Sequence, residues 1–491
     1  MSEQEEPDTV AGGKGDGVGD RLGDGADGGR ARVAVIGAGV AGLTAAYVLS
    51  RAYDVVLYEA EDRLGGHAHT HRLPAARGGT LAVDSGFIVH NERTYPHLLR
   101  LFRELGVRTQ DAEMSMSVEC EGCGLAYAGA RGPRALLGGG NLRRGRYLRM
   151  LAEVPRFHRA ARRVLDGALR TDGTTSSAPP RAAASPQPTE ARHPAELPET
   201  LGDFLRRERF SPYFTAHFAL PLVAAVWSCP PDTALRYPAA YLFRFLAHHG
   251  LLSVTGSPQW KTVTGGSAVY VAEAAKRLAA VRTGTPVRSV ARADAPTDAS
   301  TAVTGGEGAG TRGVRAYVTT EDGDTAAYAA VVLATHPDRA LRLLADPTPD
   351  ERRVLGAFTY TGNPTVLHRD TSLLPRAPHA RASWNYRLPS CTARPGSVQV
   401  SYDMNRLQRL PADEPYVVTL NAEGLVHDSA VIARMVYEHP VYTPASVAAQ
   451  RELPLLNTSV TAFAGAYHGW GFHEDGCRSG VEAARALGVT W

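Results

Sequence analysis

The chain has 491 residues, 21% of them charged, and its formal net charge is +3. This length predicts two intimately joined domains, and so small a net charge argues against a nucleic-acid partner. Apolar runs are shorter than the roughly 18 residues that cross a membrane. The N-terminal residues lack the pattern of a secretion signal, so we expect a cytoplasmic protein.

Residues 1–30 are rich in Gly and Asp and poor in apolar side chains, which predicts a disordered tail. Residues 171–199 and 293–313 are similarly biased, and we interpret them as a disordered and a flexible surface insertion. Lysine occurs only at Lys14, Lys261 and Lys276, which leaves few candidates for a catalytic lysine.

The segment Arg32–Glu59 predicts a strand, a tight turn, a helix and a second strand. Its turn has the G-x-G-x-x-G spacing, which permits the turn, the approach of a pyrophosphate and close packing of helix on strand. Glu59 ends the second strand, where a carboxylate can accept hydrogen bonds from ribose hydroxyls. The pattern predicts a bound dinucleotide, with contacts from Gly37, Ala38, Gly39, Val40, Ala41, Gly42, Glu59 and Ala60.

Three histidines, His67, His69 and His71, alternate directly after Gly65 and Gly66. On a strand they would share one face, which allows a metal site. The interpretation we prefer places His67 beside the cofactor and gives the other two no special role.

Further along, Glu92–Leu105 predicts an amphipathic helix and Met114–Ala128 a hairpin. The hairpin carries Cys120 and Cys123, and a turn at residues 121–122 would place their sulfurs opposite each other. With no second cysteine pair and no nearby histidine, we predict no metal here. Reduced cysteines beside a turn are the preferred interpretation, and a redox pair is the alternative.

The stretch Arg143–Arg170 carries nine arginines against Glu153 and Asp166, interleaved with apolar residues. Such a basic amphipathic segment can lie on an anionic membrane, although a solvated helix face has the same pattern. Pro155 is expected to interrupt or start a helix within it. Beyond it, Leu201–Leu252 predicts buried helices, and both Thr285–Thr335 and Pro364–Tyr437 contain strands.

The last block, Ala462–Gly488, predicts a strand, a glycine-rich loop and a helix. Aromatic side chains crowd the loop, where they would form an apolar wall for a substrate, and a histidine there could move protons. Packing around the helix is the competing interpretation. The catalytic candidates are therefore Tyr467, His468 and Trp470.

Several of these segments resemble the flavin amine oxidase superfamily. The resemblance rests on Glu61–Gly66, Val83–Gly86, Val263–Ser267, Thr285–Val287, Phe463–Gly465 and Glu474–Gly480. It implies FAD, held without a covalent bond, in place of NAD. It adds as cofactor-binding residues Arg63, Gly65, Gly66, His67, Gly86, Phe87, Val287, Gly465, Ala466, Asp475 and Gly476.

A closer resemblance is to a bacterial subgroup of predicted NAD/FAD-binding oxidoreductases that accompany cyclopropane-fatty-acid synthases. The segments that carry it include Phe87–Pro96, Ser383–Tyr386 and Tyr467–Gly476. Two departures from the classical amine oxidases weaken the interpretation of the chain as an amine oxidase. His67 stands where those enzymes have an arginine, and Ala466 where they commonly have a glutamate. Lys261 is the only lysine near a plausible pocket, and it fits a surface or phosphate role better.

Together these patterns predict an α/β fold, with a doubly wound Rossmann-type FAD-binding domain and an inserted α+β substrate domain. The FAD domain would comprise 31–90, 261–345 and 456–491, and the substrate domain 91–260 and 346–455. The expected activity is hydride removal from carbon of an apolar or lipid-linked substrate. The alternatives are a flavin amine oxidase and a non-catalytic flavin-binding partner of a lipid methyltransferase.

Overall fold

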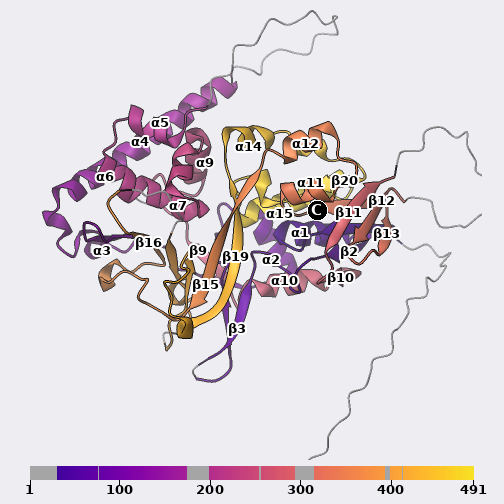
Figure 1. Cartoon of the computed structure of the whole chain (residues 1–491), viewed down its shortest axis with the longest axis horizontal. Coiled ribbons are helices and arrows are strands. Elements are labelled where there is room, and N and C mark those ends of the chain that lie inside the picture. The colour runs from indigo at the N-terminus through magenta and orange to yellow at the C-terminus, as the bar shows by residue number, and fades with distance from the viewer. Residues whose placement is uncertain are drawn as a thin grey trace, which may run out of the picture.

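The computed structural model describes residues 30–75, 77–173, 198–253, 256–293, 314–392, 399–411 and 413–491. The segments predicted to be disordered or flexible, 1–30, 171–199 and 293–313, lie almost wholly outside these ranges. Figure 1 shows a helical region at one end, strands in the middle, and a region of mixed strands and helices at the other end.

A five-stranded parallel sheet forms the centre of the mixed region. Its strand order is β10-β2-β1-β14-β20, and every neighbouring pair is parallel. The three central strands are almost entirely apolar, as expected of a sheet that is covered on both faces. The strands come from distant parts of the chain: β1 (Arg32–Ile36), β2 (Asp54–Tyr58), β10 (Ala280–Arg282), β14 (Ala330–Leu333) and β20 (Thr461–Phe463).

Different layers cover the two faces of this sheet. Helices pack on one face, namely α1 (Val40–Leu49), α2 (Pro96–Leu105), α10 (Ala268–Ala275) and α15 (His473–Ala486). The other face carries a three-stranded antiparallel sheet and two helices, namely β11 (Val287–Arg292), β12 (Ala316–Thr320), β13 (Thr325–Tyr328), α11 (Pro337–Leu343) and α12 (Pro349–Leu355). The predicted α/β fold with a Rossmann-type domain is confirmed, and one of its layers is largely a second sheet.

A seven-stranded mixed sheet forms the middle of the molecule, in the order β19-β15-β18-β17-β16-β7-β8. Its two long strands, β15 (Thr359–His368) and β19 (Val431–Val441), pair in antiparallel orientation in the middle of the molecule. The other strands are β7 (Met116–Cys120), β8 (Leu125–Gly129), β16 (Trp384–Leu388), β17 (Val400–Asp403) and β18 (Val417–Leu420). The hairpin predicted over Met114–Ala128 is β7–β8.

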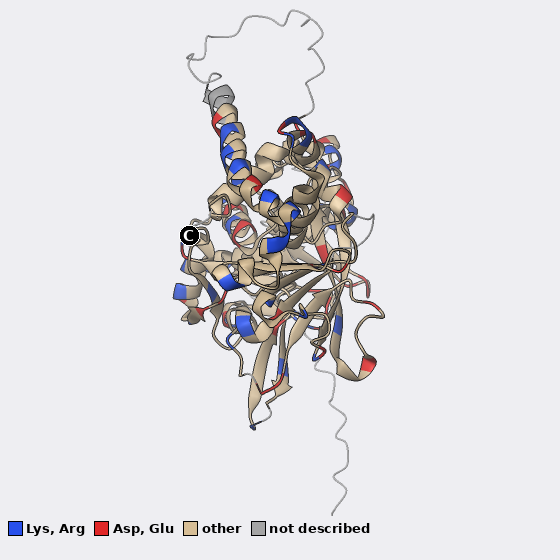
Figure 2. Ribbon diagram, turned by 90° about the vertical axis from the view of Figure 1, so that its left-hand side faces the viewer, with Lys and Arg blue, Asp and Glu red and all other residues tan. Residues whose placement is uncertain are grey.

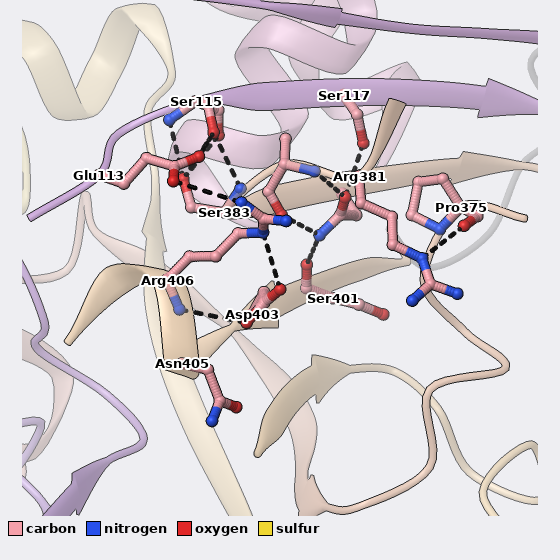
Figure 3. A network of polar contacts seen from close by, with 12 residues as sticks. Glu113, Ser115, Ser117, Pro375, Arg381, Ser383, Ser401, Asp403, Asn405 and Arg406 are labelled. Atoms are coloured by element: carbon pink, nitrogen blue, oxygen red, sulfur yellow. Dashed lines mark hydrogen bonds and ion pairs between the residues drawn. The ribbon is translucent and has the colours of Figure 1, made fainter. Parts of the chain in front are cut away.

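A row of buried polar side chains crosses this sheet. Ser117, Asn385, Ser401 and Thr419 lie on four adjacent strands in direct register. The Asn385 amide joins the row, because Oδ1 accepts from Ser117 Oγ (2.8 Å) and Nδ2 donates to the Ser401 carbonyl (3.0 Å). Figure 3 shows Ser117 and Ser401 of this row, together with a neighbouring polar network that includes Glu113, Asp403 and Arg406. Since these groups are already paired with one another, we interpret the row as structural.

The helical region packs around Phe157, whose ring contacts five other phenylalanine rings. Its elements are α4 (Gly145–Gly173), α5 (Leu201–Arg207), α6 (Pro212–Phe214), the π-helical η2 (Thr215–Ala219), α7 (Leu220–Trp227), α8 (Pro231–Arg236) and α9 (Ala239–His248). Pro155 neither interrupts nor starts α4, which corrects the prediction, because the helix runs on through it. Among the described residues no helix is long and apolar enough to span a membrane.

Shorter elements complete the fold. Two small antiparallel sheets are also present, one formed by β3 (Thr70–Pro74) with β4 (Thr80–Asp84), and one by β5 (His90–Asn91), β9 (Trp260–Val263) and β6 (Thr109–Asp111). The remaining helices are α3 (Pro133–Leu137), α13 (Met404–Leu407) and α14 (Pro444–Ala449). Helix α2 lies within the range 91–260 of the sequence and yet packs in the core of the parallel sheet.

Candidate active site

The turn after β1 has the features of a phosphate-binding loop. Gly37 adopts a positive φ of 99°, which favours glycine, and passes the chain to α1. The Ala38 N–H donates to Glu59 Oε2 at 2.7 Å, so the carboxylate at the end of β2 faces this turn. A carboxylate has about four acceptor positions. Glu59 therefore retains acceptor capacity for the hydroxyls of a ribose.

The N-terminus of α1 is open in the direction that a pyrophosphate needs. No side chain caps the helix at Gly39, and its first turn holds no acidic residue. A Cβ built on Gly39 would meet nothing within 4 Å, whereas one on Gly42 would lie 1.9 Å from the Gly37 carbonyl oxygen. Gly42 thus serves packing, while Gly39 borders free space in front of uncapped N–H groups that favour an anion.

Gly65 and Gly66 contact the loop after β1 and directly precede His67. The Gly65 N–H donates to the Ala38 carbonyl at 2.9 Å, and Arg63 Nη1 donates to the Gly66 carbonyl at 2.8 Å. Beyond them, Phe87 N–H donates to the His67 carbonyl at 2.7 Å. A Cβ on Gly86 would lie 2.1 Å from that same carbonyl oxygen, so the two segments pass in close contact. His67 is therefore held between both predicted flavin segments.

Val287, one of the predicted cofactor-binding residues, begins strand β11, which lies at the edge of its sheet beside β12 and is joined to Leu344 by a single bridge at Val290. An edge strand leaves backbone groups available to a ligand. Ala60, directly after Glu59, is exposed.

Two glycines of the C-terminal motif that are predicted to bind the cofactor, Gly465 and Gly476, lie in tightly packed positions. Helix α15 starts at His473, so Gly476 lies inside it, and a Cβ there would come within 2.7 Å of Val40 on α1. A Cβ on Gly465 would collide with the Tyr467 ring at 2.2 Å, and Ala466 follows it in a 3₁₀ turn. Both glycines thus have packing roles. Asp475 is buried and accepts hydrogen bonds from the N–H groups of Trp470 and Phe472.

A cluster of histidines surrounds His67, and sequence reasoning missed most of it. The His67 ring lies 5.0 Å from Tyr437 and 5.5 Å from His439, measured between ring centroids. His336 on the N-terminus of α11 and His473 on α15 act electrostatically on the same group. Its members come from four separate segments, which explains why a local pattern did not reveal them.

A row of hydrogen bonds leads away from this cluster. Tyr437 Oη lies 3.1 Å from His69 Nδ1 and 2.7 Å from Ser85 Oγ, which in turn lies 2.9 Å from His71 Nε2. Contrary to the metal interpretation of this alternation, His69 and His71 each bind a hydroxyl, and His67 points to Tyr437 and His439 instead. The row His69–Tyr437–Ser85–His71 could pass a proton between the cluster and the β3–β4 hairpin.

The cluster is uncharged near neutral pH. Burial, helped by the charge of Arg63, lowers the pKa of His67 to about 4. Burial also lowers the pKa of His439 and of His336, each to about 3. Asn363 Nδ2 can only donate, so His439 Nδ1 accepts at 3.0 Å and the ring proton lies on Nε2. Neutral imidazoles can accept a proton, which protonated ones cannot.

The three predicted catalytic candidates lie elsewhere. Tyr467 is buried beneath the parallel sheet against Phe358. His468 is next to it, and burial lowers its pKa to about 3. The Trp470 ring packs among side chains of α9, such as Phe245 and His248. The ring contacts of all three are with residues other than His67, although Trp470 does join the C-terminal loop to the helical region.

The prediction that Cys120 and Cys123 lack further partners is wrong. Cys123 lies in the turn after β7, so it does not face Cys120 across the hairpin, whose register pairs Cys120 with Leu125. The fold brings Cys391 and His217 to the same point. The parallel pairing of β16 with β7 delivers Cys391, and η2 delivers His217. Lys261, in contrast, fills the predicted surface role in ion pairs with Asp111 and Glu92.

Comparison with known proteins agrees with this geometry. Residues 40–368 match the family model of the flavin-containing amine oxidoreductases. A Mycobacterium tuberculosis protein, provisionally described as a flavin-containing monoamine oxidase, is 29% identical over 256 residues. That match covers 50% of this chain and 48% of the relative, so the chain spans about half the length of the curated relatives it matches.

Solved structures share the fold over nearly the whole chain. A putrescine oxidase variant superposes with a TM-score of 0.60 at 14% identity, covering 93% of this chain and 98% of its own. A fatty acid isomerase from P. acnes that produces CLA gives a TM-score of 0.58 at 16% identity, with 93% and 98% covered. The open loop at Gly39, the carboxylate of Glu59 and the edge strand β11 fit an FAD cofactor. The chain belongs to the flavin-containing amine oxidoreductase family, and its cofactor is FAD.

Proposed function

We propose that this protein is an FAD-dependent oxidoreductase that removes a hydride from carbon in an apolar, lipid-linked substrate. FAD supplies the hydride acceptor. The observation that carries the proposal is the uncharged cluster around His67. A pocket for a cationic amine would ordinarily present a carboxylate or an aromatic cage, and the surroundings of His67 favour a neutral substrate.

The carboxylates recorded around the cluster are already engaged. Asp84 accepts hydrogen bonds from Thr70, Ser267 and Gln408. Glu438 pairs with Arg339 and lies 3.4 Å from His336 Nδ1. Glu61 pairs with Arg63 at 2.8 Å. An ammonium group entering here would have to displace one of these partners, whereas an alkyl chain would not.

The histidines supply the complementary proton chemistry. When a hydride leaves one carbon, forming a double bond requires that the neighbouring carbon lose a proton. His67 is neutral and half-buried, so its ring can accept that proton, whereas His439 Nδ1 already accepts a hydrogen bond from Asn363. The row through Tyr437 and Ser85 could then carry it away. The C–H bond that loses the proton leaves its electron pair behind, and this pair becomes the second bond of the new C=C. The C–H bond that loses the hydride gives both of its electrons to the acceptor.

Anaerobic reduction of the purified holoprotein tests this proposal directly. An extracted bacterial phospholipid pool should bleach the flavin absorbance, and a panel of primary amines including putrescine should not. His67→Ala should keep its FAD but slow bleaching at least tenfold, while His427→Ala, an exposed histidine outside the cluster, should react as the wild type does. Bleaching by neither class would indicate a flavin-binding protein without turnover, such as a partner of a lipid methyltransferase.

Amine oxidation is the second candidate, supported by the names of the family and of a structural neighbour. It predicts the opposite result in the same experiment, namely bleaching by amines and none by lipid. Two features favour oxidation of an apolar substrate instead. His67 replaces the usual arginine, and the described residues around it include no free carboxylate.

We further propose that the substrate is reached from an anionic membrane through α4. Figure 2 shows basic residues along the helix that extends from the body of the protein. Leu142, just before α4, and Leu148 on it are 58% and 40% exposed, so apolar side chains accompany the charges. Arg156 and Arg162 are committed to the carbonyls of Glu208 and Leu252, which leaves docking to the more exposed arginines.

Vesicle co-sedimentation tests the membrane contact. The protein should bind vesicles that contain phosphatidylserine and ignore neutral ones, with weaker binding at higher salt, since each surface cation contributes about 1 kcal/mol. Changing Arg143, Arg149, Arg159 and Arg163 to Gln should weaken binding at least tenfold. The same change at the exposed Arg72, Arg277, Arg352 and Arg485 is the charge-matched control. Equal loss in both variants would contradict a site on α4.

A further inference from the structure

Four metal-ligating side chains meet at the junction of the seven-stranded sheet and the helical region. Cys120 ends β7, Cys123 lies in the following turn, Cys391 follows β16, and His217 lies in η2. Their ligand atoms all lie within 4.8 Å of one another. Each of the four is buried or half-buried. This cysteine–histidine cluster shares no residue with the cofactor loop or with the histidines around His67.

The spacing within the cluster matches ligands of one tetrahedral ion. The sulfurs of Cys120 and Cys391 are 3.9 Å apart, and Cys123 Sγ lies 3.7 Å from His217 Nε2. Zinc binds thiolates at about 2.3 Å and imidazoles at about 2.0 Å, which separates tetrahedral ligands by about 3.5–3.8 Å. A disulfide would instead require sulfurs about 2.05 Å apart.

His217 is oriented as a metal ligand would be. Its Nδ1 lies 3.0 Å from the Tyr213 carbonyl, which requires a proton on Nδ1 and leaves the lone pair of Nε2 directed at the cysteines. The ring also stacks on Tyr213 with a centroid distance of 3.9 Å. The π-helical turn that carries His217 is a rare conformation found mostly at functional sites.

The cysteine turn is built to present its sulfurs. The backbone N–H groups of Cys123 and Leu125 bond to the sulfurs of Cys120 and Cys123, respectively. A Cβ on Gly122 would lie 3.0 Å from the Cys391 nitrogen, so glycine allows this turn to approach the Cys391 loop. Arg144 binds the Cys123 carbonyl and holds the turn from the helical side. These contacts hold the segments that carry Cys120, Cys123 and Cys391 in place independently of any ion.

We propose that Cys120, Cys123, His217 and Cys391 bind one zinc ion in a closed structural site. Three thiolates and one imidazole form a set that zinc prefers, and four protein ligands leave no open position for catalysis. The ion would fasten the end of β7, next to the edge strand β8, and the loop after β16 to η2, between α6 and α7. It would thereby fix the helical region, which the C-terminal loop contacts through Trp470, against the sheet.

Elemental analysis of the full-length holoprotein, purified without chelator, tests this site. We expect close to one zinc per chain in the wild type. Cys123→Ser and His217→Ala should lose most of it, while His217→Cys should retain it, because a fourth thiolate restores the ligand set. Cys229→Ala, which removes a buried cysteine outside the cluster, should keep full zinc content. FAD content should be unchanged in every variant that folds.

A second measurement on the wild-type chain does not depend on variants. Exchange of the native ion for Co²⁺ should produce visible bands to the red of the flavin absorbance, with the intensity of tetrahedral thiolate coordination. The proposal is overturned if the wild type, grown with zinc, carries less than a tenth of an equivalent of metal and shows no such bands. A peptide map with Cys120 and Cys391 joined as a disulfide would overturn it as well, in favour of a redox pair.

Discussion

The cofactor loop and the cysteine–histidine cluster are assembled in opposite ways. The cofactor loop draws on one short segment, in which Gly37, Gly39 and Glu59 meet within a single strand–helix–strand unit. The cluster joins residues as far apart as Cys120 and Cys391, which differ by 271 positions. A site made by backbone geometry can be local, whereas a site made by side chains depends on the tertiary pairing of strands. The first can therefore be predicted from a sequence motif, and the second requires the fold.

Gly39→Val gives the largest expected effect, because it should abolish FAD binding without harming the fold. The structure leaves open space beside Gly39, so a branched side chain would clash only with the pyrophosphate. The variant should purify colourless with a far-UV circular dichroism spectrum like that of the wild type. Gly42→Val, whose Cβ would lie 1.9 Å from a carbonyl oxygen, should instead fail to fold. A yellow Gly39→Val protein would refute the loop assignment.

Acidification should lower the stability of the whole chain, chiefly through its buried and half-buried histidines. Eight of them have a pKa lowered by burial to about 4 or about 3, namely His67, His69, His90, His249, His336, His368, His439 and His468. Unfolding lets each one bind a proton once the pH is below 6.5, so stability is present above that pH and is lost toward pH 4.

Two carboxyls act in the opposite direction in the same range. Burial raises the pKa of Asp84 and of Asp475, each to about 6, so their contribution to stability grows as the pH falls toward 4. Because the histidines outnumber them, the melting temperature should fall between pH 7 and pH 5, as thermal scans of the holoprotein in matched ionic strength would measure. A constant or rising melting temperature would show that the histidines are not held neutral.

Asn385→Ala tests the sheet region apart from the cofactor. The change leaves the buried Ser117 hydroxyl without a partner and removes the side-chain donor to the Ser401 carbonyl, which should cost about 3 kcal/mol in the free energy of unfolding. Chemical denaturation measures that loss, and the FAD affinity of the folded variant should match that of the wild type. Asp322→Ala, in the exposed turn between β12 and β13, serves as the control. A loss below about 0.5 kcal/mol would contradict a structural role for the row.

Glu59→Gln should have the smallest effect, a weakening of FAD binding by about 1 kcal/mol. A glutamine oxygen can still accept from the Ala38 N–H, so the loop survives and only the charge is lost. Titration of the apoprotein with FAD measures the difference, which should be about fivefold in Kd. A loss as complete as that of Gly39→Val would mean that Glu59 holds the turn itself.

The sequence predicted what short-range physics determines. The turn at Gly37, the acceptor at Glu59 and the order of strand and helix followed from spacing within one unit. The cluster around His67 could not be predicted, since His336 and His439 reach it through α11 and β19. Cys391 escaped notice for the same reason. Pro155 was misjudged because α4 gains enough tertiary packing, through Phe157 for example, to tolerate a missing N–H.

The position of β20 and α15 also constrains how the protein can be made. These elements complete the parallel sheet and pack on α1, yet they are translated last among the described elements. During synthesis, one edge of β14 therefore stays unpaired until Thr461–Phe463 have left the ribosome. An unpaired strand edge invites wrong pairing, so a chaperone that shields β14 until β20 is available would raise the yield of yellow protein.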